Sequence, residues 1–592
     1  MDAVSEFKVA TNSFDAAIGR QSSATINLSL RAGEEKIHGD LYEDNENNFL
    51  NAHSYLSNNS KPATPIPPVH LNQYGGGVGG PIWIPKLYDG RKRKTFFYYT
   101  FAGIRNINPG SSGTMSLPTM AERGGDFSKS YATSNKVVFT TQIYNPATWN
   151  YDGLGNRQAF TGEQIPSVDP IAAKLLALLP PPDNAGDGAS SDSNNYTKRA
   201  EQNDKFAGNT LRLDQTWNEN NHTYVDLRKN DWTELSYDNF GPSNANGLLL
   251  QGLYQARYNR GITIDHSFTL TQRLLADLRY NLTRYEGSSY DPGAGVNPTT
   301  VGFSSAYAAL AQDPSIPAFT GIVGGADNGG MGTTQASAYG PFDTNHDFNV
   351  SMAQMWKNHS FRYGWEYIVQ QQADGSLGAS SGTFDFGQDN STKGDWTSKN
   401  PAVAAGTGEA NPIADMLLSL PSNVTSNGTT SIPTNATAFW SQHFTAFYFQ
   451  DDWKQSSKLT LNLGLRWDVQ VPITERFNRY YSRYDPNGAQ TAVTTSAQPN
   501  LCRECSGRQW RSQYRHRASA GISSGSKLAC RYWHNPVRKF ERNPRSAVNT
   551  RYKYFQPRIG FAYQLRPNTV LRGGIGRFVQ STYYTGNTSH DE

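Results

Sequence analysis

The sequence is poor in apolar residues and in cysteine, and it contains no long hydrophobic run. Only 36% of its 592 residues are hydrophobic, and the mean hydropathy is −0.64. No stretch approaches the ~20 consecutive apolar residues that a transmembrane helix needs, which excludes a helical membrane protein. Disorder is disfavoured as well, because disordered chains are depleted in aromatic residues and this chain has 32 Tyr and 28 Phe.

What remains is a long, polar chain that is rich in aromatic residues and holds 54 Gly. This composition is typical of an all-β protein. Two architectures fit it equally at this point: a large array of β-sandwiches, and an outer-membrane β-barrel.

Apolar and polar residues alternate in segments of about ten residues, the length of a tilted transmembrane strand. Residues 458–470 are the clearest case. Leu459, Leu461, Leu463 and Leu465 fall on one face, and Asn462, Arg466 and Asp468 fall on the other. Residues 276–283 repeat the pattern, with Asp277, Arg279 and Asn281 on the polar face. Strands of a soluble sandwich are usually shorter, about 5–6 residues.

The lengths of the connections favour the barrel. Turns of a few residues are predicted at 218–221, 270–273, 357–358, 455–457 and 566–568, and they alternate with long stretches rich in Gly, Ser, Asn and Pro. Short periplasmic turns that alternate with long extracellular loops are typical of an outer-membrane barrel. We therefore expect a partial antiparallel transmembrane β-barrel.

Two short helices are predicted inside the loops, at 170–179 and 412–420. Each begins with a capping residue followed by proline, Asp169-Pro170 and Asn411-Pro412, and each ends at a proline. We expect both helices to pack on the rim of the barrel rather than to gate it or to contact a ligand.

Other motifs are weaker. Gly75, Gly77 and Gly80 match a dinucleotide fingerprint, but Pro81 and Pro85 forbid the helix that this motif requires. The pair Asp451-Asp452 could serve acid–base chemistry, but its place at the end of a strand predicts a solvated rim. We expect no enzyme activity and no catalytic residue.

Several segments resemble TonB-dependent outer-membrane receptors of the Oar-like subgroup. The segments that carry this resemblance are residues 71–105, 116–128, 359–367, 447–470 and 556–578. The resemblance implies a plugged barrel in the outer membrane that imports a scarce solute, energised by the TonB complex and surrounded by lipid. The solute would be a siderophore, a carbohydrate or a peptide, captured by the long loops, with polar residues lining the lumen.

Residues 5–43 resemble the end of the plug domain running into the first barrel strand, and Gly19-Arg20 matches a plug motif. The resemblance thus divides the chain into the end of a plug, 1–35, and a partial barrel, 36–592. A signal peptide, the TonB box, most of the plug and the last strands have no counterpart. About 13 strand candidates stand against about 22 in plugged transporters, so we expect a fragment that does not transport by itself.

The window 496–551 differs from the rest of the chain. It holds ten Arg and two Lys against two Glu within 501–551, and all three cysteines of the chain. Cys502, Cys505, Cys530 and His534 would suit tetrahedral zinc and, with the arginines, a nucleic-acid binder. The long spacing between the two pairs argues against this. The family has a weakly charged Gly/Ala-rich loop here, so we interpret the window as a frameshifted loop and expect no metal, cofactor or nucleic acid.

Two alternatives remain beside the importer. A secreted β-sandwich adhesin or carbohydrate-binding protein would be soluble without detergent. A zinc-dependent nucleic-acid binder would contain stoichiometric zinc.

Overall fold

The computed structural model describes most of the chain outside its long loops. The described residues are 3–11, 15–19, 24–59, 66, 69–109, 113–134, 136–148, 157–198, 201–236, 240, 253–290, 293, 295–311, 314–324, 330–332, 342–374, 379–386, 391, 411–421, 430, 432, 438–477 and 550–579.

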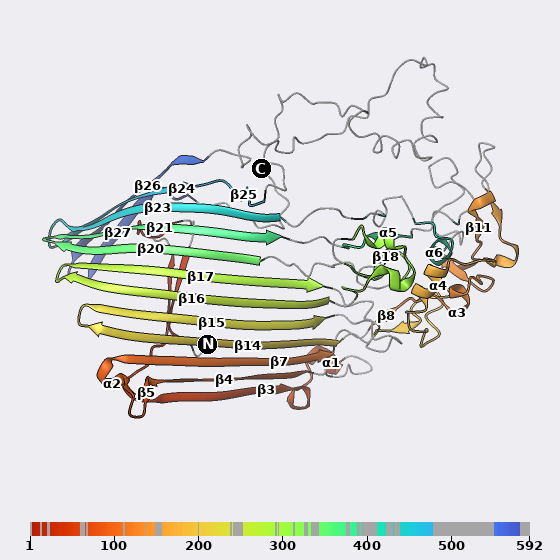
Figure 1. Ribbon diagram of the computed structural model, residues 1–592, viewed down its shortest axis with the longest axis horizontal. Helices are drawn as coiled ribbons and strands as arrows, with labels where there is room; N and C mark the ends of the chain where they lie inside the picture. The colour runs from red at the N-terminus through yellow and green to blue at the C-terminus, as the bar shows by residue number, and fades with distance from the viewer. Residues whose placement is uncertain are drawn as a thin grey trace, which may run out of the picture.

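One antiparallel sheet of 14 strands dominates the structure (Figure 1). From one edge to the other its main path runs through β3 (His38–Asn47), β4 (His70–Pro81), β7 (Thr95–Pro109), β14 (Glu201–Asn218), β15 (Asn221–Ser236), β16 (Leu253–Thr271), β17 (Leu274–Tyr290), β20 (Phe342–Trp356), β21 (His359–Asp374), β23 (Ala438–Lys454), β24 (Leu459–Gln470), β26 (Arg551–Arg566) and β27 (Thr569–Gly576). The short strand β25 (Thr474–Glu475) pairs with β23 outside this path. A single large sheet confirms the expected fold class and does not match a sandwich of two packed sheets.

The short turns lie where the sequence predicts them. β20 ends at Trp356 and β21 begins at His359, and β26 ends at Arg566 and β27 begins at Thr569. The strands are longer than the alternation alone suggests, because residues near the loops continue the same pairing. The Gly75-x-Gly77-x-x-Gly80 segment lies within β4, so it is a strand and not a nucleotide-binding turn.

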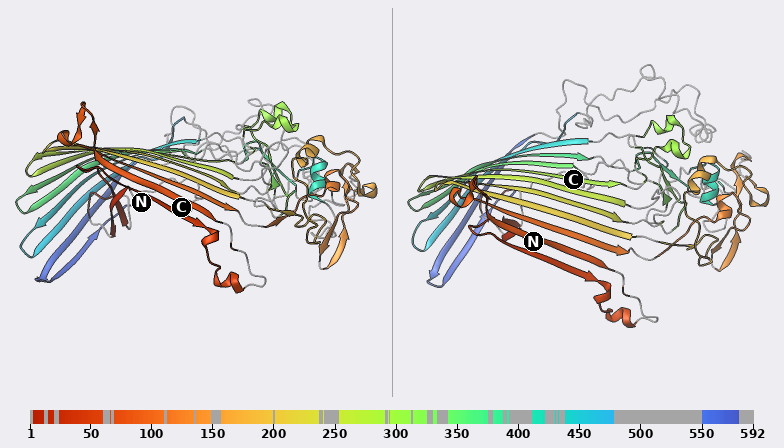
Figure 2. Two further views of the ribbon diagram at one scale, coloured as in Figure 1. Left: turned by 90° about the horizontal axis from the view of Figure 1, so that it is seen from below. Right: turned by 60° about the horizontal axis from the view of Figure 1, so that its bottom comes forward.

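The sheet is arched and has a concave and a convex face (Figure 2). A separate hairpin of β1 (Val4–Thr11) and β2 (Ala24–Leu30) lies under the arch, on the concave side. The chain leaves β2 along the first strands of the sheet, where the Arg31 guanidinium donates to the Tyr98 hydroxyl at 3.3 Å. Residues before β3 therefore lie against the concave face.

The two faces differ in polarity, as the alternation predicts. On β24, Leu463 and Leu465 are 37% and 47% exposed on the convex face, whereas Arg466 and Asp468 are buried on the concave face. Large apolar side chains are exposed on the convex face of many strands, among them Leu227, Ile264, Leu278, Phe348 and Phe447. A convex apolar surface is what an outward face in contact with lipid requires.

The long loops fold into a body of their own beyond one end of the sheet, which we call the loop module (Figure 1). It comprises the described residues of 113–198, 295–332, 379–386 and 411–421. Its elements are β8 (Thr114–Met115), α3 (Met120–Arg123), β9 (Tyr131–Ser134), β10 (Val137–Thr140), β11 (Tyr144–Asn145), β12 (Gln158–Ala159), α4 (Pro170–Leu176), β13 (Tyr196–Thr197), α5 (Ser305–Ala308), β18 (Ala318–Thr320), β19 (Gly330–Met331), β22 (Thr383–Asp385) and α6 (Pro412–Leu417). Its core of buried side chains includes Met115, Phe127, Ile143, Leu175, Leu176, Ile316, Phe319, Ile413 and Leu417.

The two predicted helices, α4 and α6, form with the predicted caps. Asp169 accepts from the Ile171 and Ala172 amides at 2.8 and 2.9 Å, and Asn411 accepts from the Ile413 amide at 2.8 Å. Their predicted position on the barrel rim is wrong. Both helices contribute to the loop-module core, because their apolar faces are buried against each other and against distant loops rather than against the sheet.

Four minor elements lie near the first strands: the 3₁₀ helix η1 (Asn48–Leu50), α1 (Tyr55–Asn59), the β5–β6 hairpin (Trp83–Ile84 and Tyr88–Asp89) and α2 (Gly90–Arg93). Within the described part of the chain, no helix is long and apolar enough to cross a membrane.

Candidate functional site

The main polar site is where residues 15–19 lie against the concave face of β21, β23, β24 and β26. We call this contact the seat. Arg466 of β24 is its centre and is 0% exposed. Its guanidinium donates to Glu366 Oε2 at 2.5 Å and to Asp468 Oδ1 at 2.7 Å. The same guanidinium donates to the Ala17 carbonyl at 3.1 Å.

Two more arginines hold the other end of the segment through Asp15. Arg362 of β21 pairs with the Asp15 carboxylate and also with Asp452 Oδ2, the latter at 2.9 Å. Arg558 of β26 donates to the Asp15 backbone carbonyl. Carboxylate and carbonyl oxygens of the segment thus face three cations of the sheet, which gives the contact both charge and direction.

Neutral amides complete the seat. Gln450 of β23 accepts from the Ala16 amide at 3.1 Å and donates to Asp452 at 3.2 Å, while Asn462 donates to the same carboxylate at 2.6 Å. The prediction of a solvated rim at Asp451-Asp452 is wrong for Asp451, which is 8% exposed and lies 2.8 Å from the His359 ring nitrogen. Asp452 keeps 29% of its side chain exposed, and it accepts from residues of three strands.

Gly19 of the plug-like motif packs directly on Arg466. A Cβ at Gly19 would overlap the Arg466 guanidinium, so only glycine leaves the arginine its place. The second residue of the motif, Arg20, lies outside the described residues.

The three polar candidates of β17, Asp277, Arg279 and Asn281, belong to a second cluster that also includes residues of β15 and β16. Arg279 pairs with Asp265 Oδ2 at 2.6 Å, and the Tyr224 hydroxyl donates to the same oxygen at 3.2 Å. Asn281 accepts from Thr263 at 2.9 Å and from Arg228 at 3.0 Å.

Strand pairing relates this second cluster to the seat. One line of directly paired residues runs across the sheet from the second cluster to the seat. Its members are, in order, Asp277, Ser351, Gly364, Tyr448 and Arg466. Paired residues point to the same face of a sheet. All six polar candidates therefore lie on the concave face, in two clusters rather than one.

Much of the seat was not predicted from the sequence, although its signal is present there. Arg362 and Glu366 alternate with aromatic residues in β21, and Gln556 and Arg558 alternate with Phe555, Pro557 and Ile559 in β26. Their polar faces could have been read from the period of two. Asp15 and Ala16 carry no such signal, because their role depends on where the loop before β2 comes to lie.

Charges in the loop module are structural. Arg123 donates to the carbonyls of Leu179 and Pro180 at 2.8 and 2.6 Å, beyond the end of α4. Burial lowers the pKa of Arg123 to about 10, and neighbouring Glu122 partly opposes that shift. Glu122 accepts from the hydroxyls of Ser130 and Ser191 at 2.6 and 2.9 Å. These groups fix the loops to one another.

The residues weighed as candidate zinc ligands, Cys502, Cys505, Cys530 and His534, lie outside the described residues, as does nearly all of the 496–551 window. Among the residues that the structure describes, no group of three or more His, Cys, Asp or Glu side chains could hold a metal ion.

Comparison with protein families gives a match over nearly the whole chain. The family model described as the outer membrane beta barrel domain matches residues 29–591. No curated protein matches the sequence.

Solved structures that match have low identity. The siderophore receptor PirA from Acinetobacter baumannii is 10% identical, with a TM-score of 0.38, covering 97% of this chain and 48% of its own. A ferric enterobactin receptor (PfeA) mutant from Pseudomonas aeruginosa is 11% identical, with a TM-score of 0.36 and coverages of 97% and 48%. The ferric-catecholate import receptor Fiu from E. coli K12 is 8% identical, with a TM-score of 0.40 and coverages of 98% and 60%. The chain thus spans about half the length of the first of these structures.

Proposed function

The chain belongs to the family of the outer membrane beta barrel domain and is a protein of the outer membrane, and from this premise we propose that it forms the barrel of an importer for a scarce solute. The solute class is a siderophore, a carbohydrate or a peptide, and the energy comes from the TonB complex. The sequence resemblance to Oar-like receptors supports this proposal.

Within the proposal, residues 1–35 are the end of a plug domain and the concave face is the lumen. The observation that carries it is the seat: Asp15–Gly19 are bound inside the arch by Arg362, Arg466 and Arg558. A segment held by charged and hydrogen-bonded contacts, rather than by an apolar core, can be released by a moderate force. That property suits a plug that must move for a solute to pass.

The polar candidates would then line the passage. Asp277, Arg279, Asn281, Asn462, Arg466 and Asp468 face the proposed lumen, and the loop module would collect the solute before it enters. Arg466 and Asp468 are already paired with each other, so their first role is to hold the plug and not to contact the solute.

Permeability of cells that carry the full-length receptor tests the seat. Arg362→Ala and Arg558→Ala each remove a contact to Asp15, so we expect increased entry of an antibiotic too large for general porins. Arg572→Ala is the control, because Arg572 is an exposed cation on the concave face of β27 and, within the described structure, forms no hydrogen bond or ion pair with residues 15–19. Unchanged sensitivity in both seat variants would contradict the plug assignment.

Transport itself needs a separate measurement. Cells that depend on this receptor are supplied with a ferric siderophore, an oligosaccharide or a peptide as the sole source of iron, carbon or nitrogen. We expect growth on one of the three that disappears when the gene for the TonB protein is deleted. Growth that survives the deletion would show that uptake is not driven by TonB.

A further inference from the structure

A polar row crosses the convex face near the loop ends of the first four strands. Asn45, Asn72, Arg105 and Lys205 occupy one register across β3, β4, β7 and β14. Their neighbours in sequence place them on the convex side: Tyr98, seven positions before Arg105, points to the concave side, where it meets Arg31. The row therefore lies at the outward surface.

The row carries two uncompensated cations. Arg105 and Lys205 are exposed and directly opposite each other, and within the described structure neither makes an ion pair. Like charges directly opposite one another on neighbouring strands are destabilising. Two other cations of the convex face do have carboxylate partners, because Arg260 pairs with Asp231 at 2.5 Å and Arg284 pairs with Glu286 at 2.5 Å. An external anion is therefore expected between Arg105 and Lys205.

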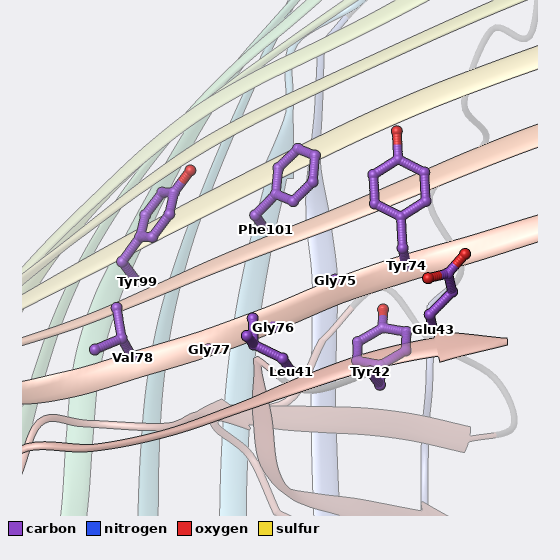
Figure 3. A pocket seen from close by; sticks show the side chains of 10 residues that line it. All are labelled: Leu41, Tyr42, Glu43, Tyr74, Gly75, Gly76, Gly77, Val78, Tyr99 and Phe101. Carbon is purple, nitrogen blue, oxygen red and sulfur yellow. The ribbon is translucent and has the colours of Figure 1, made fainter.

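A shallow groove of about 590 Å³ lies on the same strands, below the polar row toward the short turns. Figure 3 shows Tyr74, Tyr99 and Phe101 standing on one side of their strands. Leu41 and Val78 complete the apolar wall, and Glu43 is at the upper rim beside Tyr74.

Glycines form the floor of the groove. Gly76 faces the convex side between Leu41 and Phe101, and a Cβ there would collide with the Asp40 carbonyl and the Leu41 side chain. Glycine inside a strand normally weakens it and marks a place where another group approaches closely. The missing side chain at Gly76 leaves room for an elongated apolar ligand.

The distance from the polar row to the far end of the groove matches the thickness of one membrane leaflet. From the polar row to the Val78–Tyr99 row is six residues, about 20 Å along the strand and less along the membrane normal when the strand is tilted. Half of a bilayer hydrocarbon core is about 15 Å. Cations at the top and an apolar groove below are therefore arranged as the headgroup and the acyl chain of a single lipid.

We propose that Arg105 and Lys205 bind a phosphate of an outer-leaflet glycolipid whose acyl chain lies in the groove over Gly76. The loop end of the strands is the outer side of the membrane, which selects the outer leaflet. The Asn45 amide donates to Asn72 Oδ1 at 2.6 Å, and the remaining polar atoms of this pair, with Glu43, face the headgroup, where sugar hydroxyls or amides can bind them. The site lies on the lipid side of the barrel and is independent of the transport pathway.

Native mass spectrometry of the full-length protein, purified in detergent from outer membranes, tests the site. The probes are bisphosphorylated lipid A and the same lipid without phosphates. We expect one tightly held phosphorylated lipid, bound about tenfold or more weakly by the Arg105→Gln/Lys205→Gln variant, because two charge-assisted contacts are lost. Val78→Trp fills the groove and should weaken binding to a similar degree.

Matched controls remove the same charge and add the same bulk elsewhere. Lys454→Gln/Lys458→Gln deletes two exposed cations at the short-turn end, and Leu278→Trp enlarges a convex residue of β17. Both should bind like the wild type. The proposal is overturned if the Arg105/Lys205 variant, folded as judged by heat-modifiable migration, binds like these controls. Equal binding of the dephosphorylated lipid would also overturn it.

Discussion

Arg466 illustrates how a single side chain connects two distant parts of the molecule. It is fully buried, and it binds Glu366 and Asp468 on the sheet as well as the Ala17 carbonyl, 449 residues away in sequence. A buried ion pair is costly to break, because loss of one partner leaves an uncompensated charge, at about 3–5 kcal/mol. Arg466 therefore links the stability of the sheet to the presence of the segment under it.

Position on one face or the other decides what a substitution costs on β24. Leu463→Arg places a charge on the convex, lipid-facing side near mid-strand and should reduce the free energy of unfolding by about 2–4 kcal/mol. Asn462→Arg points to the polar side, where Asp452 can accept the new cation, and should cost much less. Urea titration of the protein in lipid vesicles measures both. Equal tolerance of the two variants would show that β24 does not have a lipid face.

In the loop module, two nearby carboxylates should respond oppositely to pH. Burial raises the pKa of Asp192, so its ionised form is disfavoured in the folded state. Hydrogen bonds from the Ala189 amide and the Asn194 side chain lower the pKa of exposed Asp187, so its ionised form is favoured there. Burial of Asp192 therefore costs stability at neutral pH, and this cost disappears as the pH falls below about 3.8. The contribution of Asp187 is present at neutral pH and is lost as the pH falls through its lowered pKa.

We therefore expect Asp192→Asn to increase the stability of the loop module at pH 7 and Asp187→Asn to decrease it. Both differences should shrink in acid, where the carboxylates are protonated in the folded and the unfolded state. Limited proteolysis of the loops between pH 3 and pH 8 measures the stability of the loop module in both variants. Differences of the same sign for the two variants would refute the assignment.

At the scale of the element, the loop helices depend on their caps and on packing among loops. Asp169 satisfies two amides of α4, and its own amide donates to the Leu417 carbonyl at the end of α6, at 2.9 Å. Asp169 therefore caps the free amides at the start of α4 and also joins α4 to α6.

Asp169→Ala should destabilise the loop module by about 1 kcal/mol, as expected for the loss of an N-cap. Asp169→Asn keeps an accepting oxygen and serves as the control. Because the module has its own core, we expect faster proteolysis within 157–198 while the heat-modifiable migration of the barrel stays unchanged. Loss of barrel folding in the alanine variant would show that sheet and loop module do not fold separately.

At the scale of the whole molecule, the described residues of the loop module lie beyond one end of the sheet and the short turns lie at the other (Figure 1). The polar seat and the loop module are therefore at different levels of the barrel. In an outer-membrane barrel the loop end faces the outside and the turn end faces the periplasm.

Surface labelling of intact cells checks this orientation. In a background with Cys502, Cys505 and Cys530 changed to serine, Val138→Cys in the loop module should react with a membrane-impermeant maleimide. Asn358→Cys in the β20–β21 turn should react only after the outer membrane is permeabilised. Labelling of Asn358→Cys in intact cells would reverse the proposed orientation.

The sequence by itself determined the features that repeat along the chain. A strand with one lipid-facing side must alternate with a period of two, so the faces of Leu463 and Arg466 and the turn at 357–358 can be read locally. The caps of α4 and α6 are also local, because Asp169 and Asn411 satisfy amides only two or three residues away.

Tertiary structure alone decided where those pieces meet. Packing of α4 on α6 joins residues about 240 positions apart, and Asp15 meets Arg362 and Arg558 at separations of 347 and 543 residues. No periodicity encodes such contacts, because each depends on the register of many strands between the partners. Asp452 shows the consequence: beside a turn in sequence it looked fully solvated, but the pairing of β21 with β23 brings Arg362, 90 residues away in sequence, to its carboxylate.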